Sequence, residues 1–253
     1  MNRMQKKVVD QLIALNETFY QQTAKNFDES RQHAWPGWQM LLSKYSKSIF
    51  GEVLDIGCGN GRFGEYLLES IATTTSYTGI DSNQHLLEEA QKKMAHHQKS
   101  QFIQLDVLSA VNTNALAEIS RKNHFQLVVA FGFLHHVPDK KLRENLFTTI
   151  SQSLTSSGLF VFTTWQFLAF ERLRKKIVDP SEAGIQASDL EEGDYVLDWK
   201  RGQHALRYCH AFTPTEVESL LFIAKLELIT TFMADGKEGT VNQYYVCKSR
   251  GVE

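Results

Sequence analysis

One stretch of ten residues, 53–62, constrains the fold of this chain more than any other. It reads Val-Leu-Asp-Ile-Gly-Cys-Gly-Asn-Gly-Arg, with Asp55 inside an apolar run and three alternating glycines after it. This pattern predicts a buried strand, a tight turn and the start of a helix. Because glycine has no Cβ and tolerates positive φ, the backbone of such a turn can lie against a ligand. The spacing G-x-G-x-G differs from the G-x-G-x-x-G of nicotinamide and flavin binders.

Strand-like and helix-like patterns alternate after this turn as far as residue 164. We expect further strands at 77–81, 102–106, 125–131 and 159–164, separated by helices at 63–71, 83–97, 111–120 and 139–154. The continuous apolar run 125–131 is typical of a central parallel strand that is covered on both faces. Two more strands, at 224–233 and 242–248, would form a closing antiparallel hairpin. The sequence therefore predicts an α/β fold with a doubly wound, seven-stranded sheet.

We interpret the chain as one domain with four parts. Residues 1–50 would form a helical lid, 51–164 the ligand-binding core, 165–212 an insertion on the substrate side, and 213–253 a closing helix and strand hairpin. A long insertion in a compact fold is usually functional or disordered. Its aromatic and basic residues favour an ordered structure at both ends.

Acidic residues follow two of the predicted strands. Asp81 ends the second strand about 20 residues after the glycine turn, where a ribose-binding acid is typical. Asp81 or Ser82 would also be able to cap the helix that follows. Asp106 ends the third strand.

Asp55, the three glycines, Asp81 and Asp106 together resemble the motifs of class I S-adenosylmethionine-dependent methyltransferases. The resemblance implies S-adenosylmethionine as the cofactor. It also implies that Asp106 meets the adenine amino group and that Val107 lies near the ring. The expected cofactor contacts are Asp55, Gly57, Cys58, Gly59, Gly61, Asp81, Ser82, Asp106, Val107 and Phe131.

Three further stretches narrow this resemblance. They are Phe27-x-x-x-Arg31-x-x-x-Trp35-Pro36, Leu134-His135-His136, and the pair Gly193–Trp199 and Arg207–Phe212. In combination they resemble the tRNA wobble-uridine carboxymethyl methyltransferases, which esterify a carboxymethyl group on the wobble uridine of the anticodon. The chain departs from that pattern at Asp198, where a proline is usual, and at Cys209, where a tyrosine is common. The resemblance implies tRNA as a partner and, for its eukaryotic and archaeal members, a small zinc-containing activator protein.

An acceptor carboxylate is ionised at neutral pH, so it needs an orienting cation and no general base. Arg31 and Arg207 are candidates, because a guanidinium binds a carboxylate through two hydrogen bonds. A structural salt bridge is the alternative for each. His136 would contact either substrate, or act as the base for a phenol or an amine acceptor. Packing in an apolar turn is its alternative role.

Aromatic and basic side chains provide candidates for acceptor binding. Trp35 would lie at the entrance of the pocket, whereas Trp199 and Tyr208 would stack on a base. Ordinary packing is the alternative for all three. The basic run Arg172–Lys176 would contact phosphates or form a solvated helix face.

Composition limits partners and location. The formal net charge of −2 gives no global attraction to nucleic acid, so any tRNA contact must come from local patches. Three cysteines without a C-x-x-C pair argue against a metal site and favour a reducing compartment, so we expect a cytoplasmic protein without a metal. No apolar run approaches the length of a membrane span.

Two alternative functions remain open. One is a small-molecule O- or N-methyltransferase of the same fold, and the other is a cofactor-binding protein that acts through a partner without turnover.

Overall fold

The computed structural model describes residues 4–29, 33–49, 51–71, 74–113, 115–120, 122–200 and 204–250. Its large sheet has seven strands in the order β3-β2-β1-β4-β5-β10-β9. Strands β1 to β5 are parallel, and β10 runs antiparallel to both of its neighbours, as the sequence predicted. The strands are β1 Gly51–Ile56, β2 Thr74–Asp81, β3 Ser100–Gln104, β4 Phe125–Ala130, β5 Leu154–Trp165, β9 Leu226–Ala234 and β10 Asn242–Ser249.

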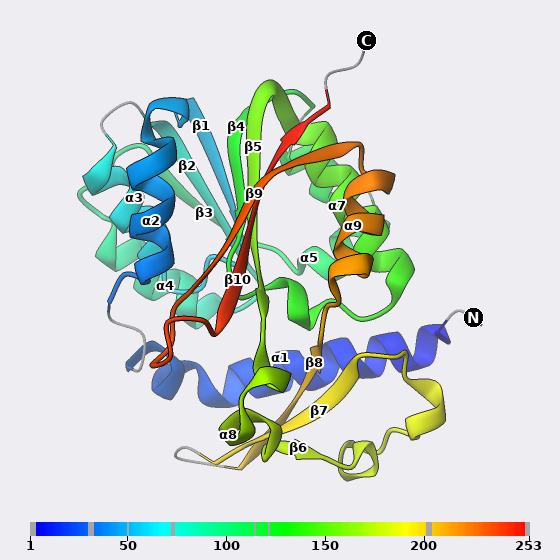
Figure 1. Ribbon diagram of the computed structural model, residues 1–253. Helices are drawn as coiled ribbons and strands as arrows, with labels where there is room; N and C mark the ends of the chain where they lie inside the picture. Colours follow the sequence, from blue (N-terminus) through cyan, green and yellow to red (C-terminus); the bar gives the residue numbers. More distant parts are fainter. Residues whose placement is uncertain are drawn as a thin grey trace.

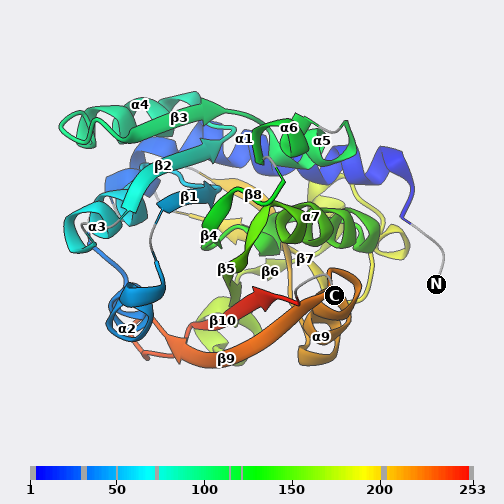
Figure 2. The same ribbon diagram turned by 90° about the horizontal axis from the view of Figure 1, so that it is seen from above.

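Helices cover both faces of this sheet (Figure 2). On one face lie α2 Pro36–Tyr45, α3 Arg62–Ser70 and α4 Gln84–Lys93, and on the other α5 Val107–Asn112, α6 Ala115–Ser120, α7 Lys140–Ser153 and α9 Pro214–Ile223. Two apolar clusters fill the space between sheet and helices, one on each face. All six residues of β4 are buried, as expected for the central strand.

Helix α1, Lys6–Glu29, runs across the end of the large sheet at which the parallel strands finish (Figure 1). Beside it lies a second, antiparallel sheet in the order β6-β7-β8, built wholly from the insertion. Its strands are β6 Ile177–Val178, β7 Asp194–Trp199 and β8 Ala205–His210, preceded by the short helix α8 Glu171–Arg174. Strand β8 packs directly on α1. The described parts of the insertion are thus ordered.

Capping side chains set several helix boundaries that the hydrophobic pattern did not reveal. Asp106 accepts hydrogen bonds from the backbone N–H groups of Leu108 and Ser109, so α5 begins at Val107 and not near 111. Asn83 caps α4 in place of Asp81 or Ser82. Thr213 caps α9 through the N–H of Glu216. The 3₁₀ turns are Ser46–Ser48, Leu134–His136, Phe167–Ala169, Pro180–Ala183 and Ala187–Asp189. Among the described residues, no helix has the length and hydropathy needed to cross a membrane.

Candidate functional site

A cavity of about 270 Å³ opens at the carboxyl ends of the parallel strands. Its walls come from the glycine turn, the ends of β2 and β3, the loop after β4, helix α1 and strand β8. This is the usual ligand position in an open α/β sheet. The cavity brings together most of the predicted site residues, namely Trp35, Asp55, Gly57, Cys58, Gly59, Asp81, Ser82, Asp106, Val107, Phe131, His136 and Arg207.

The three glycines of the turn have positive φ but different surroundings. A Cβ on Gly57 would lie 2.6 Å from the Phe133 ring, whereas a Cβ on Gly59 would meet nothing within 4 Å. Gly59 therefore presents open backbone to the cavity, which fits a ligand lying against the turn. Gly61 does not line the cavity. Its Cβ would come 2.9 Å from the Cβ of Ala90, so Gly61 lets the turn pack on α4.

The three acids differ in what holds them. Asp55 is buried beneath the turn and accepts a hydrogen bond of 2.7 Å from the Tyr77 hydroxyl. Burial raises the pKa of Asp55 to about 7, with a further contribution from the charge of Asp81. Burial also raises the pKa of Asp81, whose two oxygens accept from the N–H groups of Gly59 and Asn83. Asp106 lines the cavity while it caps α5.

Arg207 occupies the opposite wall, on β8. Its side chain is only 6 % exposed, and its guanidinium carbon lies 4.8 Å from the ring centre of Trp165, 5.2 Å from Phe19 and 5.7 Å from Trp199. In the described part of the chain, no carboxylate pairs with Arg207, and its Nε lacks a hydrogen-bond partner. A buried charge without a counter-charge is costly. The arrangement is therefore a cationic pocket suited to an anion.

His136 lies beside Arg207 in the cavity wall, and both of its ring nitrogens are engaged. Its Nε2 is 2.7 Å from the Tyr20 hydroxyl, and its Nδ1 is 3.2 Å from both the Asn16 amide nitrogen and the Tyr208 carbonyl oxygen. If Nδ1 carries the proton, it donates to the Tyr208 carbonyl and Nε2 accepts from the Tyr20 hydroxyl. If Nε2 carries it, Nε2 donates to the Tyr20 hydroxyl and Nδ1 accepts from the Asn16 amide. In either form, a hydrogen bond joins Tyr20 to His136 at the cavity.

Several residues that line the cavity do not stand out in the sequence. Asn16 and Tyr20 lie one turn apart on α1, and each reaches His136. A buried asparagine in the apolar stripe of a helix was the available signal. Arg62, the last residue of the glycine motif, lies over the stacked rings of Trp35 and Trp38, at 5.7 and 5.4 Å from their centres. It also donates to the carbonyl of His33.

Two predicted acceptor contacts lie elsewhere. Tyr208 is fully buried, and its hydroxyl donates to Asp194 at 2.7 Å. Trp199 is 7 % exposed and packs edge-on against Phe19. The structure does not support base stacking by either ring, because α1 covers them. Arg31, the other predicted cation, lies outside the described residues.

Nearby acids neutralise part of the basic run in the insertion. Arg172 forms two hydrogen bonds of 2.8 Å with Glu238, and Lys175 pairs with Glu171 at 2.7 Å. Arg174 donates to the carbonyl of Leu168. These contacts reduce the positive field that the run would offer to phosphates.

A set of potential metal ligands also lies at the cavity. The ligand atoms of His135, His136 and Cys209 lie within 4.8 Å of one another. However, hydrogen bonds occupy the ring of His136, and burial raises the pKa of the Cys209 thiol to about 11. Hydrogen bonding and burial therefore account for these side chains, and the arrangement does not favour a bound metal ion.

Comparison with known proteins identifies the core. Residues 54–160 match the family model described as a methyltransferase domain. A protein of Encephalitozoon cuniculi described as a methyltransferase is 24 % identical over 77 % of this chain and 78 % of its own length. The demethylmenaquinone methyltransferase of Oceanobacillus iheyensis is 34 % identical over 40 % of this chain and 41 % of its own length.

The fold is similar to that of solved methyltransferases. The Burkholderia thailandensis 1,6-didemethyltoxoflavin-N1-methyltransferase, solved with 1,6-didemethyltoxoflavin and S-adenosylhomocysteine, superposes with a TM-score of 0.66. The alignment covers 96 % of this chain and 91 % of that one at 15 % identity. The chain therefore carries a methyltransferase domain, and its fold is that of the class I S-adenosylmethionine-dependent methyltransferases.

Proposed function

We propose that this chain, an S-adenosylmethionine-dependent methyltransferase by domain and by fold, transfers the methyl group to a carboxylate. The observation that carries the proposal is Arg207, a buried guanidinium that faces the cavity with no carboxylate beside it among the described residues. A bound carboxylate would supply the missing counter-charge through two hydrogen bonds. The product is a methyl ester.

The residues of the site fit this chemistry. When bound, S-adenosylmethionine supplies a methyl group on a sulfonium; its C–S bond breaks as the bond to the carboxylate oxygen forms, leaving S-adenosylhomocysteine. Arg207 orients the acceptor, and the rings of Phe19, Trp165 and Trp199 keep water from it. The ionised carboxylate releases no proton, so the reaction requires no general base. The open backbone at Gly59 and the acids Asp55 and Asp81 would hold the cofactor.

Among carboxylates, we infer the carboxymethyl group of the wobble uridine in tRNA as the first candidate. The sequence stretches around Trp35, His136, Trp199 and Arg207 support this acceptor through their resemblance to that family. By the same resemblance we propose a small activator protein as a partner, and from the cysteine pattern we propose the cytoplasm as the location.

A small-molecule acceptor is the second candidate. The Tyr20–His136 pair, 2.7 Å apart at the cavity, would accept a proton from a phenol or an amine. The near-neutral net charge of −2 also suits a small acceptor. A phenol or amine acceptor, unlike a carboxylate, would make the rate depend on His136.

The test is methyl incorporation from labelled S-adenosylmethionine into total tRNA that carries unesterified carboxymethyl uridine, followed by mild base. We expect label on tRNA that base releases, since esters hydrolyse under these conditions. Base-stable label on tRNA would place the methyl group on nitrogen, carbon or ribose oxygen and overturn the carboxylate. Base-labile label on a small carboxylic acid, with none on tRNA, would keep the carboxylate and replace tRNA by the small molecule. The assay is run with the chain alone and together with a candidate activator.

A further inference from the structure

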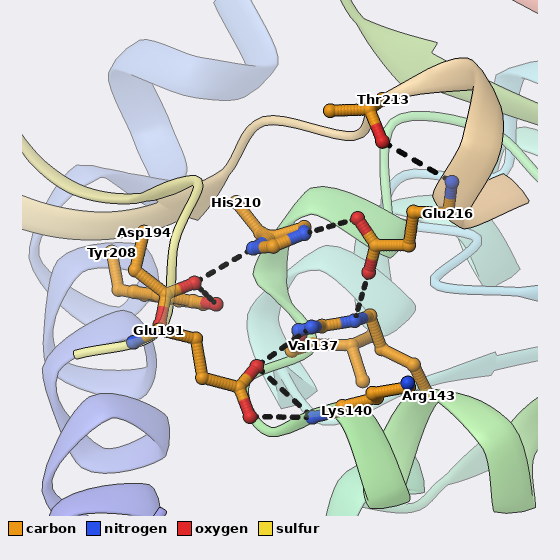
Figure 3. Close-up of polar contacts among 9 residues, drawn as sticks. All are labelled: Val137, Lys140, Arg143, Glu191, Asp194, Tyr208, His210, Thr213 and Glu216. Carbon is orange, nitrogen blue, oxygen red and sulfur yellow. Dashed lines mark hydrogen bonds and ion pairs between the residues drawn. The ribbon is translucent and has the colours of Figure 1, made fainter. Parts of the chain in front are cut away.

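A second group of charged side chains, buried or half-buried, joins the small sheet to helices α7 and α9 (Figure 3). His210, at the end of β8, has its Nδ1 at 2.7 Å from an oxygen of Asp194 and its Nε2 at 2.8 Å from an oxygen of Glu216. The His210 side chain is 1 % exposed. Ionised carboxylates accept and do not donate, so between two of them both ring nitrogens carry protons and His210 is an imidazolium.

Arg143, on α7, completes this group. Its guanidinium pairs with Glu191 at 2.8 Å and with Glu216 at 2.9 Å, and it donates to the carbonyl of Val137. The Glu191 carboxylate in turn accepts from the backbone N–H of Lys140 at the start of α7. These residues come from the insertion, from α7 and from α9, so the group fastens the small sheet to the core. We call this set, Arg143, Glu191, Asp194, His210 and Glu216, the buried ion cluster.

The cluster is connected to the cavity through Tyr208. Its hydroxyl donates to the same Asp194 oxygen that binds His210. Its backbone N–H donates to Asn16, and its carbonyl lies 3.2 Å from Nδ1 of His136. Side chains alternate along a strand, so Tyr208 and His210 face the cluster while Arg207 faces the cavity. The contacts of Tyr208 and His210 on one face of β8 therefore also fix the position of the Arg207 guanidinium on the other face.

Charge balance makes His210 the sensitive member. The cluster holds three carboxylates, Glu191, Asp194 and Glu216, against the two cations Arg143 and His210⁺. Losing the imidazolium proton would leave the buried Asp194 and the half-buried Glu191 and Glu216 with one cation, which is costly. Burial works to lower the pKa of His210, but its hydrogen bonds with Asp194 and Glu216 outweigh burial, so the pKa lies above its ordinary value.

We propose that His210 is a positioning residue of the acceptor site, which as an imidazolium clamps β8 so that Arg207 and the Tyr208 carbonyl are held at the cavity. This inference rests on the proposed role of Arg207. It gives a function to the buried ion cluster, which takes no direct part in cofactor binding or in methyl transfer. The acceptor site should consequently loosen as pH rises through the pKa of His210, while the cofactor site should not.

The test compares wild type, His210→Gln, Glu216→Gln and the control Glu238→Gln, which alters an exposed pair with Arg172. The first readout is amide hydrogen exchange of the β8 peptide that contains Arg207 and Tyr208. We expect exchange at least tenfold faster in His210→Gln than in wild type near neutral pH. Wild type should approach the variant as pH rises, after correction for intrinsic exchange. Unchanged exchange in a folded His210→Gln protein would overturn the proposal, whatever the acceptor.

The second readout is the KM for the acceptor against the Kd for S-adenosylmethionine. We expect His210→Gln to raise the acceptor KM about tenfold or more, with the cofactor Kd within twofold, and to abolish the alkaline decline of kcat/KM. Glu238→Gln should match wild type. Faster exchange with an unchanged acceptor KM would show that β8 is clamped but that Arg207 does not bind the acceptor, so the proposed function would fail separately. If His210→Gln does not fold, Glu216→Gln, which keeps a hydrogen-bonding oxygen, is measured in its place with the same expected directions.

Discussion

Gly59 and Gly61 lie two residues apart in one turn, yet their substitution by alanine should have different effects. Both have positive φ, so either alanine costs about 1 kcal/mol of backbone strain. A Cβ at position 61 would also clash with Ala90, which adds about 1–3 kcal/mol. A Cβ at position 59 would point into the open cavity. We expect Gly61→Ala mainly to lower the free energy of unfolding, and Gly59→Ala mainly to weaken cofactor binding.

Denaturant unfolding and titration calorimetry with S-adenosylmethionine check this pair. The prediction is contradicted if the two variants have the same free energy of unfolding and lose the same amount of cofactor affinity.

Asp55 should make cofactor binding depend on pH. Burial raises the pKa of Asp55 in the folded protein from the ordinary 3.8 to about 7. Ionisation of Asp55 therefore lowers the free energy of unfolding. The stability contributed by the protonated form is fully present below pH 3.8 and is lost as pH rises through about 7. A cationic ligand favours the ionised form. The affinity for S-adenosylmethionine should therefore rise with pH up to about 7 and then level off. In Asp55→Asn, affinity should be lower and flat over that range. A wild-type affinity that is constant from pH 5.5 to 8 would show that Asp55 does not couple to the ligand.

At the residue scale, the cofactor side was more predictable than the acceptor side. The residues of the glycine turn and the strand-end acids are close in sequence to the elements that present them, so their positions follow from local structure. Tyr208 and Trp199 were assigned to base stacking because they are aromatic and lie in an insertion. Only the three-dimensional structure shows that α1 covers both rings.

Helix α1 is the element that joins the insertion to the cavity. Leu12 is fully buried in a small cluster with Met4, Val8, Ile185 and Tyr208. We expect Leu12→Ala to lower the free energy of unfolding by about 2–5 kcal/mol, because it leaves a cavity between α1 and β8. Thr18→Ala, at an exposed position of the same helix, should change it by less than about 0.5 kcal/mol. Similar values for both variants in a denaturant titration would mean that α1 is not docked on the small sheet.

The elements themselves were partly predictable. Apolar runs and periodicity gave the order and approximate place of the strands of the large sheet. The small sheet was not predicted, because β7 has five buried residues out of six and shows no alternation between faces. Helix α5 was placed too late in the sequence because its start depends on one hydrogen-bonding side chain, Asp106, and not on the apolar pattern.

At the scale of the whole molecule, the α/β core follows from sequence, but the assembly of the site does not. Asn16 bonds to the backbone of Tyr208, 192 positions away, and this contact brings the N-terminal helix, the insertion and the core loop together around one cavity. No local pattern encodes a contact of that separation. The aromatic enclosure of Arg207 arises from the same assembly, since its rings come from α1, β5 and β7.

The measurement that tests the central claim most directly is methyl-ester formation by Arg207→Gln and Arg207→Lys. The control is Arg172→Gln, which alters an exposed arginine. A lost charge-assisted hydrogen bond is worth about 1.5–3 kcal/mol, so kcat/KM for the carboxylate acceptor should fall roughly 10- to 100-fold in Arg207→Gln. It should fall less in Arg207→Lys and not at all in Arg172→Gln, with the cofactor Kd unchanged throughout. A folded Arg207→Gln enzyme that forms the ester with wild-type kcat/KM would contradict the account.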